Sequence, residues 1–155
     1  MPLLKIINNM KILGTFLVVC LFFACQQNED SGSNKVNPYL GKWAWEKSDS
    51  TNSFSIEIIQ KGDSLLGTYC GVVRGGAKMD CGIDKNDIAF WFKATNDKSV
   101  TFDFQSYREN DIGKASLSLE KEYLVWKVIQ SPKTEHYAWK EAKMLRLPQK
   151  GQQKK

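Results

Sequence analysis

Short segments that alternate apolar and polar residues, separated by turn signals, fill the chain from residue 41 to residue 147. In FSIEIIQ, for example, Phe54, Ile56 and Ile58 share one parity, and similar segments follow KGDS, DKND, TNDK and RENDIG. A repeat of two residues is typical of β-strands that bury one face. The pattern occurs eight or nine times, and nothing between these segments predicts a long helix.

The connections between these segments are short, which favours neighbouring antiparallel strands. Each apolar face needs a cover, and a sheet that closes on itself provides the cover and removes free edges. We therefore predict an all-β domain, an antiparallel up-and-down meander that closes into a barrel of about eight strands. A β-sandwich is the alternative. Seven large side chains are expected to point inward: Trp43, Phe54, Phe90, Phe92, Phe102, Phe104 and Trp126.

The segment CGVVRGGAKMDC is symmetric about two glycines. A two-residue turn at Gly75 and Gly76 would use the positive φ that glycine permits, and pairing outward from it places Cys70 opposite Cys81. Residues opposed in this way lie within reach of a disulfide. We predict a structural Cys70–Cys81 bridge. A metal or redox site is the alternative, although the chain has one histidine and no CxxC motif.

An uncharged apolar run ends at Cys25. Residues 12–24 are too few for a membrane-spanning helix of about 20 residues, but they suit the apolar core of a secretory signal. The end of the run resembles a bacterial lipobox, with the small residue Ala24 just before the cysteine. This resemblance implies a lipoprotein signal peptide over 1–24 and lipidation of Cys25, which becomes the mature N-terminus. The alternative is an ordinary secretory signal with an incidental cysteine.

The rest of the chain divides into three parts. Residues 25–38 form a polar stretch without apolar periodicity, which predicts a lipidated flexible tether. Residues 39–148 form the barrel domain, and 149–155 a basic disordered tail. We expect a lipid-anchored protein of the bacterial cell envelope, with the outer membrane as its site, on the periplasmic or the surface face. The oligomeric state and the choice of Met1 or Met10 as the start stay open.

The charges of the domain argue against nucleic acid as a partner. Between Asn37 and Pro148 there are sixteen Lys and Arg and fifteen Asp and Glu residues, a net charge of +1. These charges are interspersed along the sequence, whereas a nucleic-acid-binding protein gathers basic residues on one face. The expected partners are therefore the membrane, through the lipid, and either a small apolar molecule or an envelope protein or glycan.

Both ends of the domain are similar to the calycin barrels, the lipocalins and avidins. Those barrels begin with Gly-x-Trp, which Gly41 and Trp43 match, and avidins continue to a Gly-Thr-Tyr-like step, matched at residues 67–69. The resemblance implies a small β-barrel in which Trp43 packs across the barrel end against a basic residue of the last strand. Arg146 is the candidate for that residue. The polar residues of the avidin biotin site have no match that can be assigned.

The interior of an eight-stranded barrel is either filled by side chains or holds one small ligand. Our first hypothesis is a lipocalin-like protein that binds a small, partly apolar ligand in the barrel. The candidate ligand-binding residues are Trp45, Phe90, Phe92, Phe102, Phe104 and Trp126. The alternative is a filled barrel that binds a protein or glycan, as an accessory factor or inhibitor, through an outer aromatic face. Arg74, Trp91 and Tyr107 are the candidates for that face, and Tyr69 and Tyr123 share its polar parity.

The sequence contains no catalytic constellation. His136, the single histidine, lies beside Glu135 on the longest connection, and such a pair could act as a base. A third hypothesis is therefore an enzyme with a cleft near residues 130–141. The simpler alternative is that His136 is a surface histidine without a catalytic role. No nucleophile can be assigned, and Walker, GxSxG and HExxH patterns are missing. We predict no catalytic residue, no metal and no cofactor.

Overall fold

The computed structural model describes residues 36–82, 84 and 86–148. The expected signal peptide, the lipidation site at Cys25, most of the tether and the tail lie outside the described residues. The elements are β1 (Gly41–Trp45), β2 (Ser53–Lys61), β3 (Ser64–Val73), η1 (Arg74–Gly76), β4 (Lys78–Cys81), β5 (Phe90–Lys93), β6 (Ser99–Gln105), β7 (Ile112–Glu120), β8 (Tyr123–Gln130) and β9 (Glu141–Arg146). In the described part of the chain, no helix is long and apolar enough to cross a membrane.

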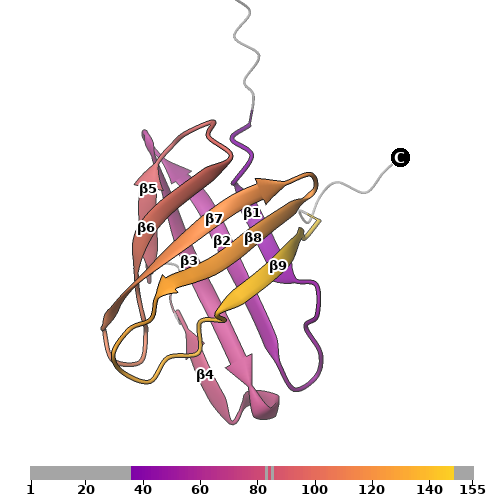
Figure 1. The fold of residues 1–155 in the computed structure, drawn as a ribbon, viewed down its shortest axis with the longest axis vertical. Helices are drawn as coiled ribbons and strands as arrows, with labels where there is room; N and C mark the ends of the chain where they lie inside the picture. The colour runs from indigo at the N-terminus through magenta and orange to yellow at the C-terminus, as the bar shows by residue number, and fades with distance from the viewer. Residues whose placement is uncertain (1–35, 83, 85, 149–155) are drawn as a thin grey trace, which may run out of the picture. The chain divides into compact units, whose positions relative to one another are not determined.

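The strands form one antiparallel sheet that closes on itself. Their hydrogen-bonded order is β2-β1-β9-β8-β7-β6-β5-β3-β4, and an additional pairing joins β2 to β3. This pairing closes a barrel of eight strands, with β4 as a further strand beside β3 (Figure 1). The predicted all-β class, the antiparallel meander and the closed barrel of about eight strands are confirmed.

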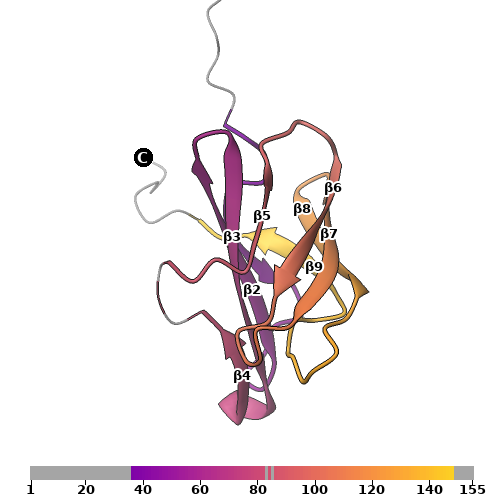
Figure 2. The same ribbon diagram turned by 90° about the vertical axis from the view of Figure 1, so that its left-hand side faces the viewer.

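The ten-residue strand β3 has two partners in succession along one edge. Residues 64–67 pair with β5, and residues 70–73 pair with β4. After β4 the chain leaves this edge and returns at Ala89, whose N–H donates to the carbonyl of Gly67 at 2.9 Å. The described residues of this connection stand away from the ladder (Figure 2). They therefore form a raised border beside the outer face of β3.

The β3–β4 hairpin has the predicted register. Cys70 is paired with Cys81, and the two residues form a disulfide with a Cα–Cα distance of 4.1 Å. Gly75 and Gly76 have φ angles of 65° and 93°, the positive values that a tight hairpin turn needs. The predicted Cys70–Cys81 bridge is confirmed.

Replacing both cysteines by serine should lower the free energy of unfolding by about 2 kcal/mol, because the bridge restricts a short loop of the unfolded chain. Urea denaturation of the oxidised protein and of the double variant measures this difference. Reduction of the unmodified protein is the control, since it breaks the same bond without a substitution, and should give a similar loss. Equal stability of the oxidised and reduced proteins would contradict the prediction.

Aromatic side chains fill the middle of the barrel. All seven large side chains predicted to point inward are buried. At the centre, Trp126 is 0% exposed. Its ring lies between 5.3 and 6.2 Å from five others, those of Phe54, Tyr69, Phe90, Phe102 and Phe104. Because each such side chain buries about 150–250 Å² of surface, this cluster dominates the stabilisation of the core.

The prediction that Tyr69 points outward is wrong. Tyr69 is 2% exposed and belongs to the inner face of β3, together with Gly67 and Gly71. A Cβ atom at Gly67 would lie 2.0 Å from the Phe90 ring, and one at Gly71 would lie 2.0 Å from the carbonyl oxygen of Tyr137. The inner face of β3 thus uses glycine where large neighbours approach. Because glycine has no apolar side chain, the sequence of β3 does not show which of its two faces is buried.

Trp43 and Arg146 close the end of the barrel where the chain enters β1. They are directly paired on β1 and β9, and the guanidinium carbon of Arg146 lies 4.3 Å from the centre of the Trp43 ring. Arg146 also donates hydrogen bonds to the carbonyls of Leu40 and Pro38, while the Trp43 indole N–H donates to the carbonyl of Tyr39 at 3.0 Å. This is the contact that the calycin resemblance implies.

Candidate functional site

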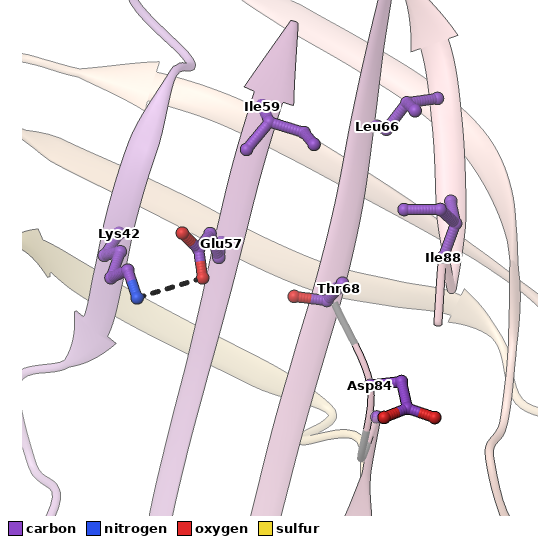
Figure 3. A pocket seen from close by; sticks show the side chains of 8 residues that line it. Lys42, Glu57, Ile59, Leu66, Thr68, Asp84 and Ile88 are labelled. Atoms are coloured by element: carbon purple, nitrogen blue, oxygen red, sulfur yellow. Dashed lines mark ion pairs between the residues drawn. The ribbon is translucent and has the colours of Figure 1, made fainter. Parts of the chain in front are cut away.

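A groove of about 470 Å³ lies on the outer face of β1, β2 and β3 (Figure 3). We call it the outer groove. It is lined by Lys42, Glu57, Ile59, Leu66, Thr68, Gly82, Asp84 and Ile88. The strand residues among them alternate with residues of the core, so the groove and the aromatic interior occupy opposite faces of the same strands.

A polar row crosses the floor of the outer groove. Lys42, Glu57 and Thr68 are directly paired from β1 to β3, so their side chains are neighbours on one face. The Nζ atom of Lys42 lies 3.1 Å from Oε2 of Glu57. Among the described residues, neither Oε1 of Glu57 nor the Thr68 hydroxyl has a hydrogen-bond partner. The row therefore has no net charge, and it offers one free acceptor and one free hydroxyl.

An apolar row lies next to the polar row. Ile59, Leu66 and Trp91 are directly paired across β2, β3 and β5. Trp91 is 62% exposed and Ile59 is 46% exposed. Ile88 lies close to Leu66, as Figure 3 shows. Exposed apolar side chains that are gathered in this way and bordered by polar groups are typical of a binding surface.

A second recess extends the outer groove. It has a volume of about 200 Å³ and shares Lys42, Glu57, Thr68 and Gly82 with the larger hollow. Its other lining residues are Trp43, Ser55, Ile56, Tyr69, Cys70 and Leu147. The two hollows therefore adjoin each other on the outer face of the sheet.

Of the three predicted surface residues, Trp91 alone belongs to the apolar row beside the outer groove. Arg74 is exposed at the tip of the β3–β4 hairpin. Tyr107 does not face outward as expected: its ring is half-buried 5.2 Å from that of Tyr69, and its hydroxyl donates to the carbonyl of Asp87. Burial raises the pKa of Tyr107 to about 12.

The other tyrosine of the expected outer aromatic face is also removed from Trp91. Tyr123 is partly buried on β8, where the Nζ atom of Lys143 lies 3.7 Å from the centre of its ring. The outer face therefore carries one exposed tryptophan with aliphatic neighbours, and the tyrosines serve packing roles elsewhere.

The six residues predicted to bind an internal ligand fall into two places. Phe90, Phe92, Phe102, Phe104 and Trp126 pack against one another in the core. The closest of their ring contacts joins Phe90 to Phe102, with 4.6 Å between the centres. Trp45 is partly buried against the edge of this core, where its ring packs on that of Trp139, also at 4.6 Å. A ligand inside the barrel would have to displace ring contacts that the side chains already make with each other.

Asp80 organises the end of the barrel opposite the Trp43–Arg146 pair. It is 1% exposed, and its Oδ2 accepts hydrogen bonds from the Tyr69 hydroxyl at 2.6 Å, the Ser106 hydroxyl at 3.1 Å and the Tyr137 N–H at 3.1 Å. Its Oδ1 accepts from the Tyr107 N–H at 2.9 Å. One carboxylate thus joins β3 and β4 to the 106–111 turn and the 131–140 connection.

Sequence reasoning missed Asp80, although a signal was present. In the predicted hairpin register Asp80 faces Gly71, and the structure places both on the inner side of the sheet. A charged residue on the inner face has to be paired or hydrogen-bonded. Burial, followed by the hydrogen bond to Asp80, raises the pKa of Tyr69 far above its usual value.

The His136–Glu135 base of the enzyme hypothesis is not formed. The Glu135 carboxylate binds Lys78 at 2.6 Å and Arg108 at 3.3 Å, and the bond to Lys78 is the leading cause that lowers the pKa of Glu135 to about 2. The His136 ring lies edge-on to Phe104, and its buried Nδ1 has no hydrogen-bond partner among the described residues. In the same part of the chain, no group of three or more His, Cys, Asp or Glu residues is placed to hold a metal ion.

Comparisons with known proteins do not add a function to this geometry. No protein-family model matches the chain, and no curated protein or solved structure matches it either. The likeness to calycin barrels therefore rests on the closed barrel and on the pair formed by Trp43 and Arg146 at its end.

Proposed function

We propose that the chain is a lipid-anchored binding protein of the bacterial envelope that holds an uncharged glycan in its outer groove. The observation that carries this proposal is the position of the exposed Trp91 and Ile59 in one row beside a polar row in which Lys42 and Glu57 form an ion pair. Anchoring at Cys25 completes the proposal, since residues 26–37, twelve residues in all, would reach about 20 Å as a flexible chain and keep the domain close to a bilayer.

The chemistry of the groove favours a glycan over a charged polymer. Glu57 neutralises the cation of Lys42, and Asp84 adds one negative charge at the border of the groove. This single net charge is too small to attract a charged polymer strongly. A sugar ring has one face of C–H groups, which packs on an exposed aromatic side chain, and a rim of hydroxyls, which bond to carboxylate and hydroxyl groups. The apolar row and the polar row match these two parts of a sugar.

An internal ligand is the competing proposal, and the packing of the core weighs against it. Trp126 contacts five other rings in the middle of the barrel. Interiors of this kind are packed as densely as organic crystals, so room for a ligand has to come from lost contacts. The outer groove needs no such rearrangement.

The Trp91→Ala variant should weaken glycan binding by about ten- to thirtyfold, because a few residues carry most of the binding energy of a surface and tryptophan is enriched among them. The assay is isothermal titration with a panel of soluble envelope-type oligosaccharides, using the full chain exported by a bacterial host and purified in detergent. Ile129→Ala is the matched control: Ile129 is 55% exposed on β8, far along the sheet from the groove, and the variant should bind as the unmodified protein does.

Equal binding by the Trp91→Ala variant and the unmodified protein would overturn the proposal. Failure of every oligosaccharide to bind, with capture of an envelope protein that depends on Trp91, would overturn it in favour of a protein partner on the same face. The proposal is supported if an oligosaccharide binds the unmodified protein and the Ile129→Ala variant equally well but binds the Trp91→Ala variant more weakly.

A further inference from the structure

We infer that the outer groove selects sugars that carry an acetamido group, which is an amide ending in a methyl. The inference rests on the proposed glycan function and adds the substrate class. It follows from what the groove places together: a free carboxylate oxygen on Glu57, a free hydroxyl on Thr68, and the apolar side chains of Ile59 and Leu66.

The spacing along β2 matches the length of an acetamido group. Glu57 and Ile59 are two residues apart on the same face, which puts their Cα atoms about 6.5 Å from each other. An amide that donates its N–H to a carboxylate at about 2.9 Å and touches an aliphatic side chain with its methyl at about 4 Å spans this separation. The N–H of the sugar would therefore point to Glu57 while the methyl lies on Ile59.

The pairing across the sheet supplies the third contact. Thr68 is directly opposite Glu57, and the side chains of such a pair lie about 5 Å apart. The Thr68 hydroxyl is then in reach of the amide carbonyl, which needs a donor. On the same side, Leu66 is directly opposite Ile59, and Figure 3 shows Ile88 close to Leu66, so the methyl meets an apolar surface formed by several side chains.

A sugar with a hydroxyl in place of the acetamido group makes only part of these contacts. It can bond to Glu57 or Thr68, but it leaves Ile59 and Leu66 in water. One missing methylene contact in an apolar pocket typically changes discrimination by about ten- to two-hundredfold. We take about tenfold as the expected preference, because Ile59 is only half-buried.

The test compares two β-1,4-linked oligomers of equal length, one of N-acetylglucosamine and one of glucose, by titration against the full chain in detergent. The two probes share their backbone and linkage and differ in the acetamido group. We expect about tenfold tighter binding of the acetylated oligomer. Ile59→Ser should reduce this preference to less than about twofold, whereas Ile129→Ser, at another exposed isoleucine on β8, should leave it intact.

The outcomes separate the acetamido inference from the glycan proposal. Equal binding of both oligomers, with both weakened by Trp91→Ala, would overturn the acetamido inference and leave the glycan proposal standing. Binding of neither oligomer nor of any other sugar would overturn both. A preference that persists in Ile59→Ser would also overturn the inference, provided that thermal melting shows the variant to be folded. The inference is supported if the preference for the acetylated oligomer is lost in Ile59→Ser and kept in Ile129→Ser.

Discussion

The Asp80→Asn variant is expected to lose about 3 kcal/mol of unfolding free energy. Asp80 accepts four hydrogen bonds, and a carboxylate satisfies all of them because both of its oxygens are acceptors. Asparagine has nearly the same size, but one of its two terminal atoms is a donor. If its oxygen faces Tyr69, Ser106 and Tyr137, its NH₂ group faces the N–H of Tyr107, and two buried donors are left without partners.

Asp103→Asn is the matched control for this experiment. Asp103 lies on the outer face of β6, its side chain is 64% exposed, and it forms an ion pair with Lys114 at 3.1 Å. Exposed ion pairs contribute little, so this variant should lose less than about 1 kcal/mol. Urea denaturation gives both numbers. Similar small losses in the two variants would show that the hydrogen bonds to Asp80 do not hold the barrel end together.

Hydrogen exchange locates the effect of Asp80→Asn within the fold. The N–H groups of Tyr107 and Tyr137 belong to two connections that Asp80 ties to the hairpin. Their exchange should accelerate far more than that of the strand amides of β7 and β8. A uniform acceleration across the barrel would instead indicate a general loss of stability.

The alternation of apolar and polar residues was sufficient to predict the fold, because the apolar residues of each strand mark the face that the strand buries. In β6, for example, Phe102 and Phe104 alternate with exposed residues, and the structure buries both. The symmetric hairpin sequence likewise determined the pairing of Cys70 with Cys81. These are local patterns, and local patterns are what a single sequence displays most directly.

The outer groove could not be predicted in this way, because it depends on which strands become neighbours. Ile59, Leu66 and Trp91 come from three separate segments, and only the β2–β3 and β3–β5 registers bring them into one row. The position of Trp91 on the polar parity of its strand predicts that it faces outward, but the sequence does not identify its neighbours across the sheet. The interruption between β4 and β5, which lets Asp84 and Ile88 border the groove, leaves no periodic signal in the sequence.

The inner and outer faces of the strands have different roles. The inner face packs rings against rings, and it holds Trp91 and Ile59 at fixed positions on the other side of the same sheet. A binding surface on rigid strands needs little ordering when a ligand arrives, which reduces the entropic cost of association. The aromatic core can therefore serve the proposed function without touching a ligand.

Removal of the central ring tests this division of roles directly. Trp126→Ala should lower the free energy of unfolding by about 4 kcal/mol, because the surrounding rings cannot close the cavity that it leaves. Trp91→Ala deletes the same side chain from the exposed face and should cost less than about 0.5 kcal/mol. Trp126→Phe, a smaller truncation, keeps the comparison usable if the alanine variant is too unstable to purify.

Indole then distinguishes a packed barrel from a hollow one. Added indole should raise the melting temperature of Trp126→Ala, because an apolar cavity of matching shape binds the missing ring and any ligand of the native state stabilises it. The unmodified protein should show no such shift if Trp126 occupies that space. A loss below about 1 kcal/mol in Trp126→Ala, or an equal indole shift in both proteins, would mean that the interior has room of its own, and the internal-ligand hypothesis would then replace the outer groove as the leading one.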